Sequence, residues 1–346
     1  MVRVGIINVT GYAGAELARL LFAHPEARLT SVSGRSAAGK TLAEVFPHLA
    51  AYDLTLSEEI GDVDFAFSAL PHAASAEALA PLVRAGVPVV DISADFRLRD
   101  PLEYARWYGV EHPAPDLLSR AAYGLTELNR DAVRSSRLVA NPGCYPESAL
   151  LALAPAVKEG IIGPDVIIDS KSGVSGAGRT LGLAYHFAEA NESVSAYGLA
   201  GHRHLPEIVQ ELAAMWPKGE APEAPRPKVT FTPHLIPMTR GILSTCYAPL
   251  LPGAVQSGEQ ARELYREFYK GEPFVRVVDA PPASKQVAGS NVCLVHPTVD
   301  ARTERLVVVS VIDNLVKGAA GQAIQNMNAM LGLSETAGLE MPAVYP

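Results

Sequence analysis

The sequence predicts an α/β protein with two domains, and two patterns lead to this prediction. Up to residue 143, short apolar runs alternate with segments whose leucines and alanines recur at helical spacing. Such alternation is typical of a parallel sheet, because parallel strands need a helical crossover. After residue 143, strand-like runs follow one another with few long helices between them, which predicts a largely antiparallel or mixed sheet.

The individual elements are expected at the following positions. In the first domain, strands are predicted at residues 2–7, 28–33, 63–70, 87–92 and 137–140, and helices at 14–23 and 73–85. In the second domain, a helix is predicted at 148–158, and strands at 166–170, 229–234, 241–250, 274–279, 291–296 and 306–312. A final helix from 316 to 330 is expected to pack back on the first domain. The predicted domains are therefore residues 1–143 together with 316–346, and residues 144–315. Residues 217–228 are predicted to form a solvated loop.

Composition excludes several classes of protein. The 346 residues are 48 % apolar and 19 % charged, with a net charge of −8, so a sequence-independent grip on nucleic acid is not expected. The three cysteines are too few and too scattered for a disulfide framework or a zinc cluster. The N-terminus leads directly into a strand without signal-peptide features, and no apolar run is long enough to span a membrane. We expect a cytoplasmic protein that acts on a small molecule.

A nucleotide site is predicted between the first strand and the first helix. The segment from residue 8 to 14 reads Asn-Val-Thr-Gly-Tyr-Ala-Gly, at the place where a dinucleotide pyrophosphate binds on a helix N-terminus. Asn8 stands where a first glycine is expected, but asparagine tolerates left-handed backbone angles. A tight turn without a ligand is the alternative. The candidate cofactor residues are Thr10, Gly11, Tyr12, Ala13 and Gly14.

The end of the second predicted strand indicates which dinucleotide is bound. An NAD site usually has an acidic residue there, but this chain has Ser33-Gly34-Arg35-Ser36. An arginine flanked by hydroxyl groups suits a 2′-phosphate, so NADP is favoured, with Ser33, Arg35 and Ser36 as contacts. The alternative for Arg35 is an ordinary solvated arginine.

Cys144 is the candidate nucleophile. It follows the turn Asn141-Pro142-Gly143 and precedes a helix, whose positive end lowers the pKa of a thiol. The backbone N–H groups of Cys144 and Tyr145 are expected to bind an oxyanion. The other two cysteines, Cys246 and Cys293, are expected to be small buried apolar side chains.

His202-Arg203-His204 is a second cluster of reactive side chains, just before a helix that begins near Pro206. A histidine pair can bind metal, but the sequence nearby offers no third or fourth ligand, so no metal is predicted. A histidine that acts as acid or base beside a thiolate fits better. Ordinary hydrogen-bonded histidines are the alternative.

Several ordered motifs, which cover nearly the whole chain, match one known family. They are residues 11–14 (GYAG), 70–72 (LPH), 93–97 (SADFR), 141–146 (NPGCYP), 173–179 (GVSGAGR), 202–204 with 206–208 (HRH, PEI), and 313–322 (DNLVKGAAGQ). With these motifs the sequence resembles the N-acetyl-gamma-glutamyl-phosphate reductases of arginine biosynthesis, which are related to aspartate-semialdehyde dehydrogenase. The resemblance implies an N-terminal Rossmann domain, a catalytic domain of the glyceraldehyde-3-phosphate dehydrogenase type, and a C-terminal helix that returns to the first domain.

The resemblance also implies an activity: reduction of N-acetyl-L-glutamyl 5-phosphate by NADPH through a thioester on Cys144, in a homodimer or homotetramer. His204 matches the acid/base of the family, with His202 as a close rival. Further cofactor contacts implied by the motifs are Leu70, Pro71, Ser175, Gly176, Asn314 and Gly318, and implied substrate contacts are Arg97, Asn141 and Arg203. The chain departs from the family pattern at Asn8, where a glycine is usual, and at Glu147, where a threonine is usual.

Two alternatives remain open at this point. One is a sister enzyme on the same scaffold that acts on aspartyl phosphate or on a carrier-bound aminoadipyl phosphate. The other is a non-catalytic NADP-binding sensor or scaffold, although this chain retains both the thiol and the histidines.

Overall fold

A computed structural model describes residues 1–217 and 227–345, so most of the loop predicted at 217–228 lies outside the described residues. The chain divides into two compact units, Met1–Gly143 with Ala319–Met341, and Cys144–Gly318 with Pro342–Pro346. The returning segment is thus shorter than the expected 316–346. At one end, Gly318 packs against Cys144 of the second unit, since a Cβ on it would lie 2.8 Å from the Cys144 Cβ. At the other end, the Val344 N–H donates to the Ala288 carbonyl at 2.8 Å.

The first unit contains a six-stranded parallel sheet in the order β2-β1-β3-β4-β6-β5. Its strands are β1 (Val2–Ile7), β2 (Ala27–Val32), β3 (Phe65–Ser68), β4 (Val89–Asp91), β5 (Ala121–Tyr123) and β6 (Leu138–Ala140). The parallel sheet confirms the predicted fold class. The sequence analysis missed β5, because three residues are too few to show a period.

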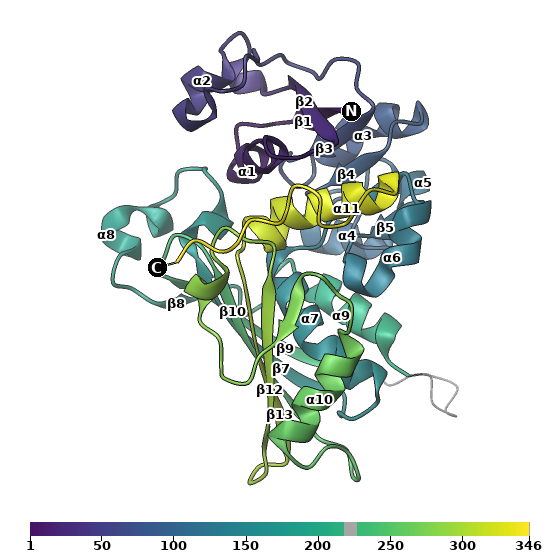
Figure 1. The fold of residues 1–346 in the computed structure, drawn as a ribbon, viewed down its shortest axis with the longest axis vertical. Helices are drawn as coiled ribbons and strands as arrows, with labels where there is room; N and C mark the ends of the chain where they lie inside the picture. The colour runs from purple at the N-terminus through teal and green to yellow at the C-terminus, as the bar shows by residue number, and fades with distance from the viewer. Residues whose placement is uncertain (218–226, 346) are drawn as a thin grey trace. The chain divides into compact units, whose positions relative to one another are not determined.

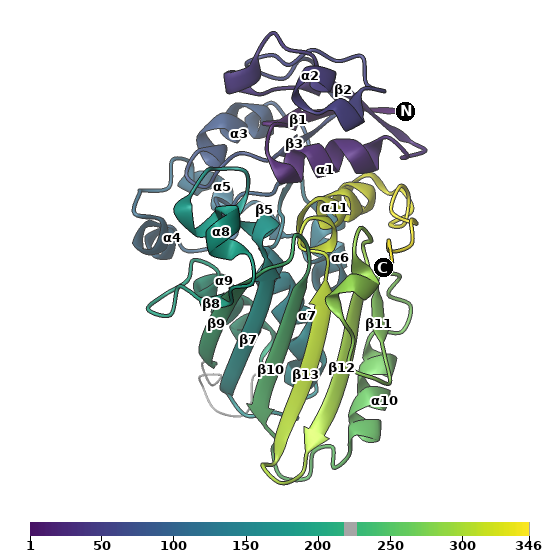
Figure 2. The ribbon, with the colours of Figure 1, turned by 90° about the vertical axis from the view of Figure 1, so that its left-hand side faces the viewer.

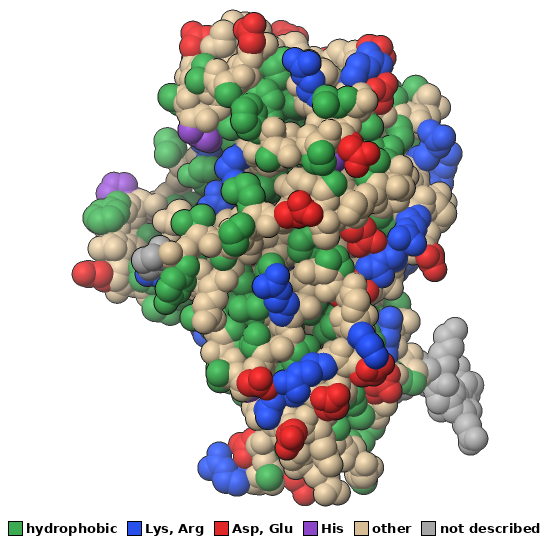
Figure 3. Space-filling model, viewed as in Figure 1, with side chains coloured by type: hydrophobic (Ala, Val, Ile, Leu, Met, Phe, Trp, Pro, Cys, Tyr) green, Lys and Arg blue, Asp and Glu red, His purple; other side chains and the backbone are tan. Residues whose placement is uncertain are grey.

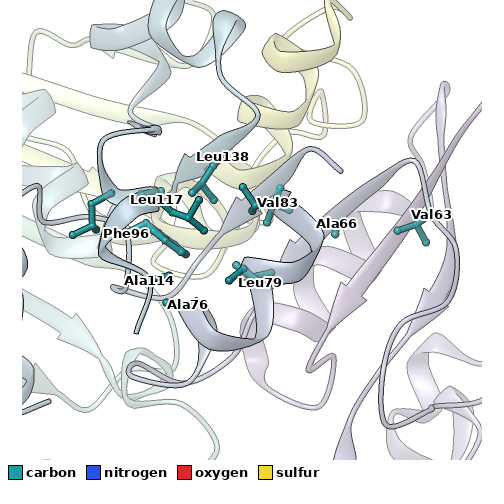
Figure 4. Packing of buried hydrophobic residues seen from close by; sticks show 13 residues of the cluster. Val63, Ala66, Ala76, Leu79, Val83, Phe96, Ala114, Leu117 and Leu138 are labelled. Carbon is teal, nitrogen blue, oxygen red and sulfur yellow. The ribbon is translucent and has the colours of Figure 1, made fainter. Parts of the chain in front are cut away.

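Helices cover both faces of this sheet (Figure 1). They are α1 (Tyr12–Leu21), α2 (Leu42–Val45), α3 (Ser75–Arg84), α4 (Pro101–Tyr108), α5 (Pro115–Leu118), α6 (Thr126–Ser135) and α11 (Gly321–Leu331), with short 3-10 turns η1 (Arg35–Ala37) and η2 (Pro47–Leu49). One face is packed by α3 and α5, whose Leu79, Val83 and Leu117 meet Leu138 of β6 in a buried apolar cluster (Figure 4). Against the other face lie α1 and α11.

The second unit is built on a seven-stranded sheet in the order β11-β12-β13-β10-β7-β9-β8. Its strands are β7 (Asp165–Gly173), β8 (Ser195–Ala196), β9 (Lys228–Ile236), β10 (Ile242–Pro249), β11 (Val275–Val277), β12 (Cys293–Asp300) and β13 (Arg305–Ile312). The pairs β7–β9 and β11–β12 are parallel and the other pairs are antiparallel, which confirms the predicted mixed sheet.

The long helices of this unit, α7 (Cys144–Lys158), α9 (Leu205–Met215) and α10 (Gly258–Phe268), pack on one face of the sheet, and no long helix among the described residues covers the opposite, open face (Figure 2). Shorter elements complete the unit: α8 (Phe187–Ala190), the 3-10 turns η3 (Val174–Ala177), η4 (Leu183–Tyr185) and η5 (Ser284–Val287), and a π-helical turn, η6 (Val316–Ala320). The predicted final helix is therefore two elements, because the π-helical turn precedes α11.

Candidate active site

The turn after β1 has the backbone geometry that a dinucleotide loop needs. Asn8 adopts a φ of +62°, the left-handed conformation that was expected of it in place of glycine. Its side-chain Nδ2 donates to the Ala69 carbonyl at 2.9 Å, and its Oδ1 accepts from the Thr10 hydroxyl at 3.0 Å. Asn8 therefore supplies the glycine conformation and also ties this loop to the loop after β3.

The start of α1 fits the pyrophosphate of a dinucleotide. Gly11 is the N-cap, and among the described residues no side chain caps the helix. The first turn of α1 contains no acidic residue. The first N–H groups of a helix otherwise need an acceptor, and a phosphate provides one. Gly14 packs so closely that a Cβ would lie 2.6 Å from the Val9 Cα, and only glycine allows the helix to approach the turn after β1 in this way.

The predicted NADP residues gather at one edge of the parallel sheet. Since β2, β1 and β3 are adjacent and parallel, the loops that follow them meet at their carboxyl ends. Arg35 and Ser36 are exposed in η1, and Ser33 is buried just before them. After β3, Leu70 is half-buried and Pro71 is exposed. The structure therefore brings the cofactor residues predicted in the first unit to one place.

Cys144 is the first residue of α7, so the helix begins four residues earlier than the predicted 148. Pro146 lies in the first turn, where its missing N–H costs nothing. The Cys144 side chain is partly exposed, whereas Cys246 and Cys293 are fully buried, as expected. Burial raises the pKa of the Cys246 thiol to about 12. Cys144 is thus the accessible thiol among the three.

The histidine pair lies against the residue that follows Cys144. The Tyr145 ring centroid is 5.7 Å from that of His202 and 5.9 Å from that of His204. The Tyr145 hydroxyl lies 2.9 Å from the Tyr197 hydroxyl. Burial raises the pKa of Tyr145 far above its ordinary value and that of Tyr197 to about 12, so both hydroxyls stay protonated.

The two histidines differ in their electrostatics. The Nδ1 of His202 accepts the backbone N–H of His204 at 3.1 Å, which leaves the proton of the neutral ring on Nε2. Burial, and next the neighbouring Arg203, lower the pKa of His202 from 6.5 to about 4. His202 is therefore neutral at pH 7. The Arg203 side chain itself is exposed.

Glu147, the departure from the family pattern, belongs to a buried ion pair. Its Oε1 lies 3.6 Å from the Nζ of Lys317, and both side chains are 0 % exposed. A lone carboxylate near Cys144 would raise the pKa of the thiol. Because an ammonium group faces the carboxylate, the pair adds no net charge to the start of α7.

Other predicted residues of the second unit cluster around Asn314. Its Nδ2 donates to the Ser175 hydroxyl at 3.0 Å, and its Oδ1 accepts the Gly241 N–H at 2.7 Å. A Cβ on Gly176 would lie 3.6 Å from the same Nδ2. The structure therefore brings together Ser175, Gly176 and Asn314, while Gly318 lies against Cys144.

Two predicted substrate contacts are taken up by protein partners within the first unit. Arg97 is 5 % exposed, and its Nε and Nη2 donate to the carbonyls of Asn141 and Ile92 at 2.8 and 2.7 Å. Asn141 is fully buried, and its amide bonds to Ala319 and Asn326. Both side chains are therefore held by protein groups of the first unit, and their contact with substrate stays a prediction.

Sequence reasoning missed Tyr197 and Lys317 as neighbours of the site. Tyr197 lies in a stretch with no regular period, so no local signal marks it. Lys317 stands inside a family motif, but its partner Glu147 precedes it by 170 positions, and only the fold brings them together.

The described residues, 1–217 and 227–345, contain no clustered metal ligands and no membrane-spanning helix. No group of three or more His, Cys, Asp or Glu is arranged there to hold a metal ion. None of the helices there is both long and apolar enough to cross a membrane. On the face shown in Figure 3, Lys and Arg side chains lie scattered among Asp and Glu, without a broad basic area.

Comparison with known proteins identifies the class. Residues 3–136 match the NAD-binding domain of semialdehyde dehydrogenases, and residues 144–314 match the dimerisation domain of the same class. An N-acetyl-gamma-glutamyl-phosphate reductase of Dehalococcoides mccartyi strain CBDB1 is 56 % identical over 99 % of both chains. Another of Pelotomaculum thermopropionicum is 52 % identical over 100 % of this chain and 99 % of its own. The chain belongs to the N-acetyl-gamma-glutamyl-phosphate reductase family of semialdehyde dehydrogenases.

Solved structures support the same fold. Aspartate semialdehyde dehydrogenase II of Vibrio cholerae, complexed with ASA, superposes with a TM-score of 0.69 at 18 % identity, covering 96 % of this chain and 98 % of its own. The aspartate semialdehyde dehydrogenase of Candida albicans, solved with NADP, gives a TM-score of 0.68 at 17 % identity, covering 98 % of this chain and 99 % of its own. At these identities the likeness concerns the fold alone.

Proposed function

We propose that this chain reduces N-acetyl-L-glutamyl 5-phosphate to N-acetyl-L-glutamate 5-semialdehyde and phosphate, with NADPH as reductant, as a step of arginine biosynthesis. The observation that carries the proposal is the partly exposed Cys144 at the first residue of α7, next to a tyrosine that contacts both histidines. The substrate assignment is supported by relatives with that name at 46 to 56 % identity over nearly the full chain.

Cys144 is the proposed nucleophile. The positive end of the 15-residue helix α7 stabilises the thiolate, which attacks the acyl carbon of the substrate. A C–S bond forms, and the C–O bond to phosphate breaks with its electron pair on the phosphate. The backbone N–H groups of Cys144 and Tyr145 would hold the oxyanion of the tetrahedral intermediate. The product of this step is a thioester on Cys144.

His204 is the proposed acid and base, and His202 orients it. A general acid needs a pKa near the working pH, and the pKa of about 4 makes His202 a poor proton donor at pH 7. His204 protonates the oxygen of the thiohemiacetal on Cys144, then takes that proton back as the C–S bond breaks. The aldehyde leaves and the thiolate is restored.

The cofactor residues follow from the fit of the first unit to a dinucleotide. The turn Thr10 to Gly14 would hold the pyrophosphate at the start of α1, and Arg35 with Ser33 and Ser36 would hold the 2′-phosphate that distinguishes NADP from NAD. When bound, NADPH supplies the hydride that reduces the thioester carbonyl. Leu70, Pro71, Ser175, Gly176, Asn314 and Gly318 are the further proposed contacts.

We further propose a homodimer or homotetramer in the cytoplasm. Association is supported by the match to a dimerisation domain and by the open face of the seven-stranded sheet, where Ile167, Leu243 and Tyr247 are only half-buried. The cytoplasm is supported by three free cysteines, which suit a reducing compartment. The exposed Arg203 is the proposed contact for an anionic group of the substrate.

One assay tests the function directly. The purified chain should reduce NADP when given N-acetylglutamate 5-semialdehyde, and only when phosphate is present. Aspartate semialdehyde should react at least about 100-fold more slowly, because a site built for the acetylamide leaves polar groups unpaired with the smaller substrate. Equal rates with both aldehydes, or reduction that ignores phosphate, would reject the assignment.

A further inference from the structure

We propose that Asn326, on α11, is a positioning residue for the Cys144 thiol. It acts through Asn141, three residues before Cys144 in the sequence. The proposal deepens the proposed function and rests on it for the kinetic measurement, but not for the chemical labelling described below.

Every hydrogen-bonding group of Asn141 has a partner within the first unit. Its backbone N–H donates to the Asp91 carbonyl at 2.8 Å, and its carbonyl accepts the Arg97 Nε at 2.8 Å. Its side-chain Nδ2 donates to the Ala319 carbonyl at 3.2 Å, and its Oδ1 accepts the Asn326 Nδ2 at 3.0 Å. With the side chain fully buried, these bonds fix Asn141 from four directions.

The amide of Asn326 can take only one orientation in this network. Its Nδ2 donates to the Gly124 carbonyl at 2.8 Å as well as to Asn141, and its Oδ1 accepts the Thr126 hydroxyl at 2.7 Å. The Thr126 hydroxyl in turn accepts the Gln322 Nε2 at 2.9 Å. A flipped amide would place two donors or two acceptors face to face, which is costly for buried groups.

Gly124 shows how closely this network is packed. A Cβ there would lie 2.5 Å from the Asn326 Nδ2, so only glycine allows the amide to reach the Gly124 carbonyl and Asn141 together. The hydrogen bonds therefore form a chain in which each residue donates to the next: Gln322 to Thr126, Thr126 to Asn326, and Asn326 to Asn141. The network links α6 and α11 to Asn141, in the turn that precedes Cys144.

The bond between Asn141 and Ala319 lies close in sequence to two of the points where the chain passes from one unit to the other, at residues 143–144 and 318–319. Asn141 and Ala319 bond to each other in the first unit. Cys144 comes three residues after Asn141, and Gly318 comes directly before Ala319. Cys144 and Gly318 contact each other in the second unit. Pro142 stiffens the short link to Cys144 because its ring fixes φ. Loosening Asn141 should therefore loosen the thiol.

The test compares Asn326→Asp with Asn328→Asp. Both asparagines are 0 % exposed on α11, but Asn328 bonds to His24 and to the Glu335 and Ala337 carbonyls, away from Asn141. Asn326→Asp removes the donor to Asn141 while keeping the size of the side chain. We expect kcat to fall by roughly 10- to 100-fold, because small misplacements of reacting groups cost about that much, with the KM for NADPH unchanged.

Alkylation by iodoacetamide supplies a measurement that needs no substrate. Cys246 and Cys293 are buried, so the rate and its pH profile report on Cys144. Asn326→Asp should change the alkylation rate by about 5-fold or more, whereas Asn328→Asp should keep kcat and this rate within about twofold. Equal losses in both variants, or none in Asn326→Asp, would overturn the proposal. Altered alkylation in a protein that fails the semialdehyde assay would reject the substrate assignment alone.

Discussion

Two turns of this chain join a strand to a helix through an asparagine, and they use it in opposite ways. Asn8, after β1, takes a φ of +62° and leaves the start of α1 without a side-chain cap. Asn141, after β6, is fully buried with each of its polar groups bonded to protein. The first turn leaves its helix start uncapped, as the proposed pyrophosphate site requires, whereas protein groups order the second turn, which we propose positions the Cys144 thiol.

The largest expected effect follows from removing the reactive side chain of the second turn. In Cys144→Ser, turnover should fall by more than about 1,000-fold, because the hydroxyl is a far weaker nucleophile than a thiolate. NADPH affinity, measured by fluorescence titration, should stay within about twofold, since the first turn is unaltered. Activity within tenfold of the unmodified chain would show that Cys144 is not the nucleophile.

Breaking the ion pair below the second turn should cost stability. Glu147→Gln leaves Lys317 buried without its counter-charge, and such losses are about 3 kcal/mol or more. Urea unfolding measures the change in the free energy of unfolding. Glu159→Gln, on an exposed residue just after the same helix, is the matched control with an expected effect near zero. Equal stability of the two variants would contradict the importance of the pair.

Two glycine variants in the first turn separate its effect on stability from its effect on NADPH binding. Gly14→Ala places a methyl group 2.6 Å from the Val9 Cα, so it should lower the free energy of unfolding by about 1–3 kcal/mol. Gly11→Ala meets nothing within 4 Å and should leave the unfolding midpoint unchanged, yet weaken NADPH binding. If Gly11→Ala binds NADPH normally, the pyrophosphate does not rest on this turn.

The preference for NADPH should depend on Arg35. In Arg35→Ala, the ratio of kcat/KM for NADPH to kcat/KM for NADH should fall by about tenfold, because one charge-assisted hydrogen bond to the 2′-phosphate is lost. Lys40→Ala, on another exposed cation of the same segment, is the control. An unchanged ratio in Arg35→Ala would show that Arg35 is an ordinary solvated arginine, the alternative interpretation.

The last expected effect is a pH dependence of stability near the second turn. The pKa of His202 falls from 6.5 to about 4 on folding, so between these values the unfolded chain binds the extra proton. The stability that the neutral ring contributes is therefore present above pH 6.5 and is lost as pH falls toward 4. His202→Gln should flatten thermal unfolding midpoints over this range. A slope identical to that of the unmodified chain would refute the shift.

Much of the fold could be predicted because its signals are local. The strand at residues 2–7 was predicted with its observed ends, and the other predicted strands were found within a few residues of their ends. The start of α7 was missed because Pro146 and the preceding turn obscure helical spacing. Among the site residues, the cofactor turn was predicted from its glycines and its position after a strand, which are also local features.

The sequence alone determined the alternation of strands and helices, the thiol at a helix start and the missing acid after β2, since each depends on a few neighbouring residues. Only the tertiary structure decided what Asn141 does, because its partners Ala319 and Asn326 lie 178 and 185 positions away. The same holds for Glu147, whose charge is balanced by Lys317 from η6. Buried polar groups must find partners wherever the fold supplies them, and no local pattern records that choice.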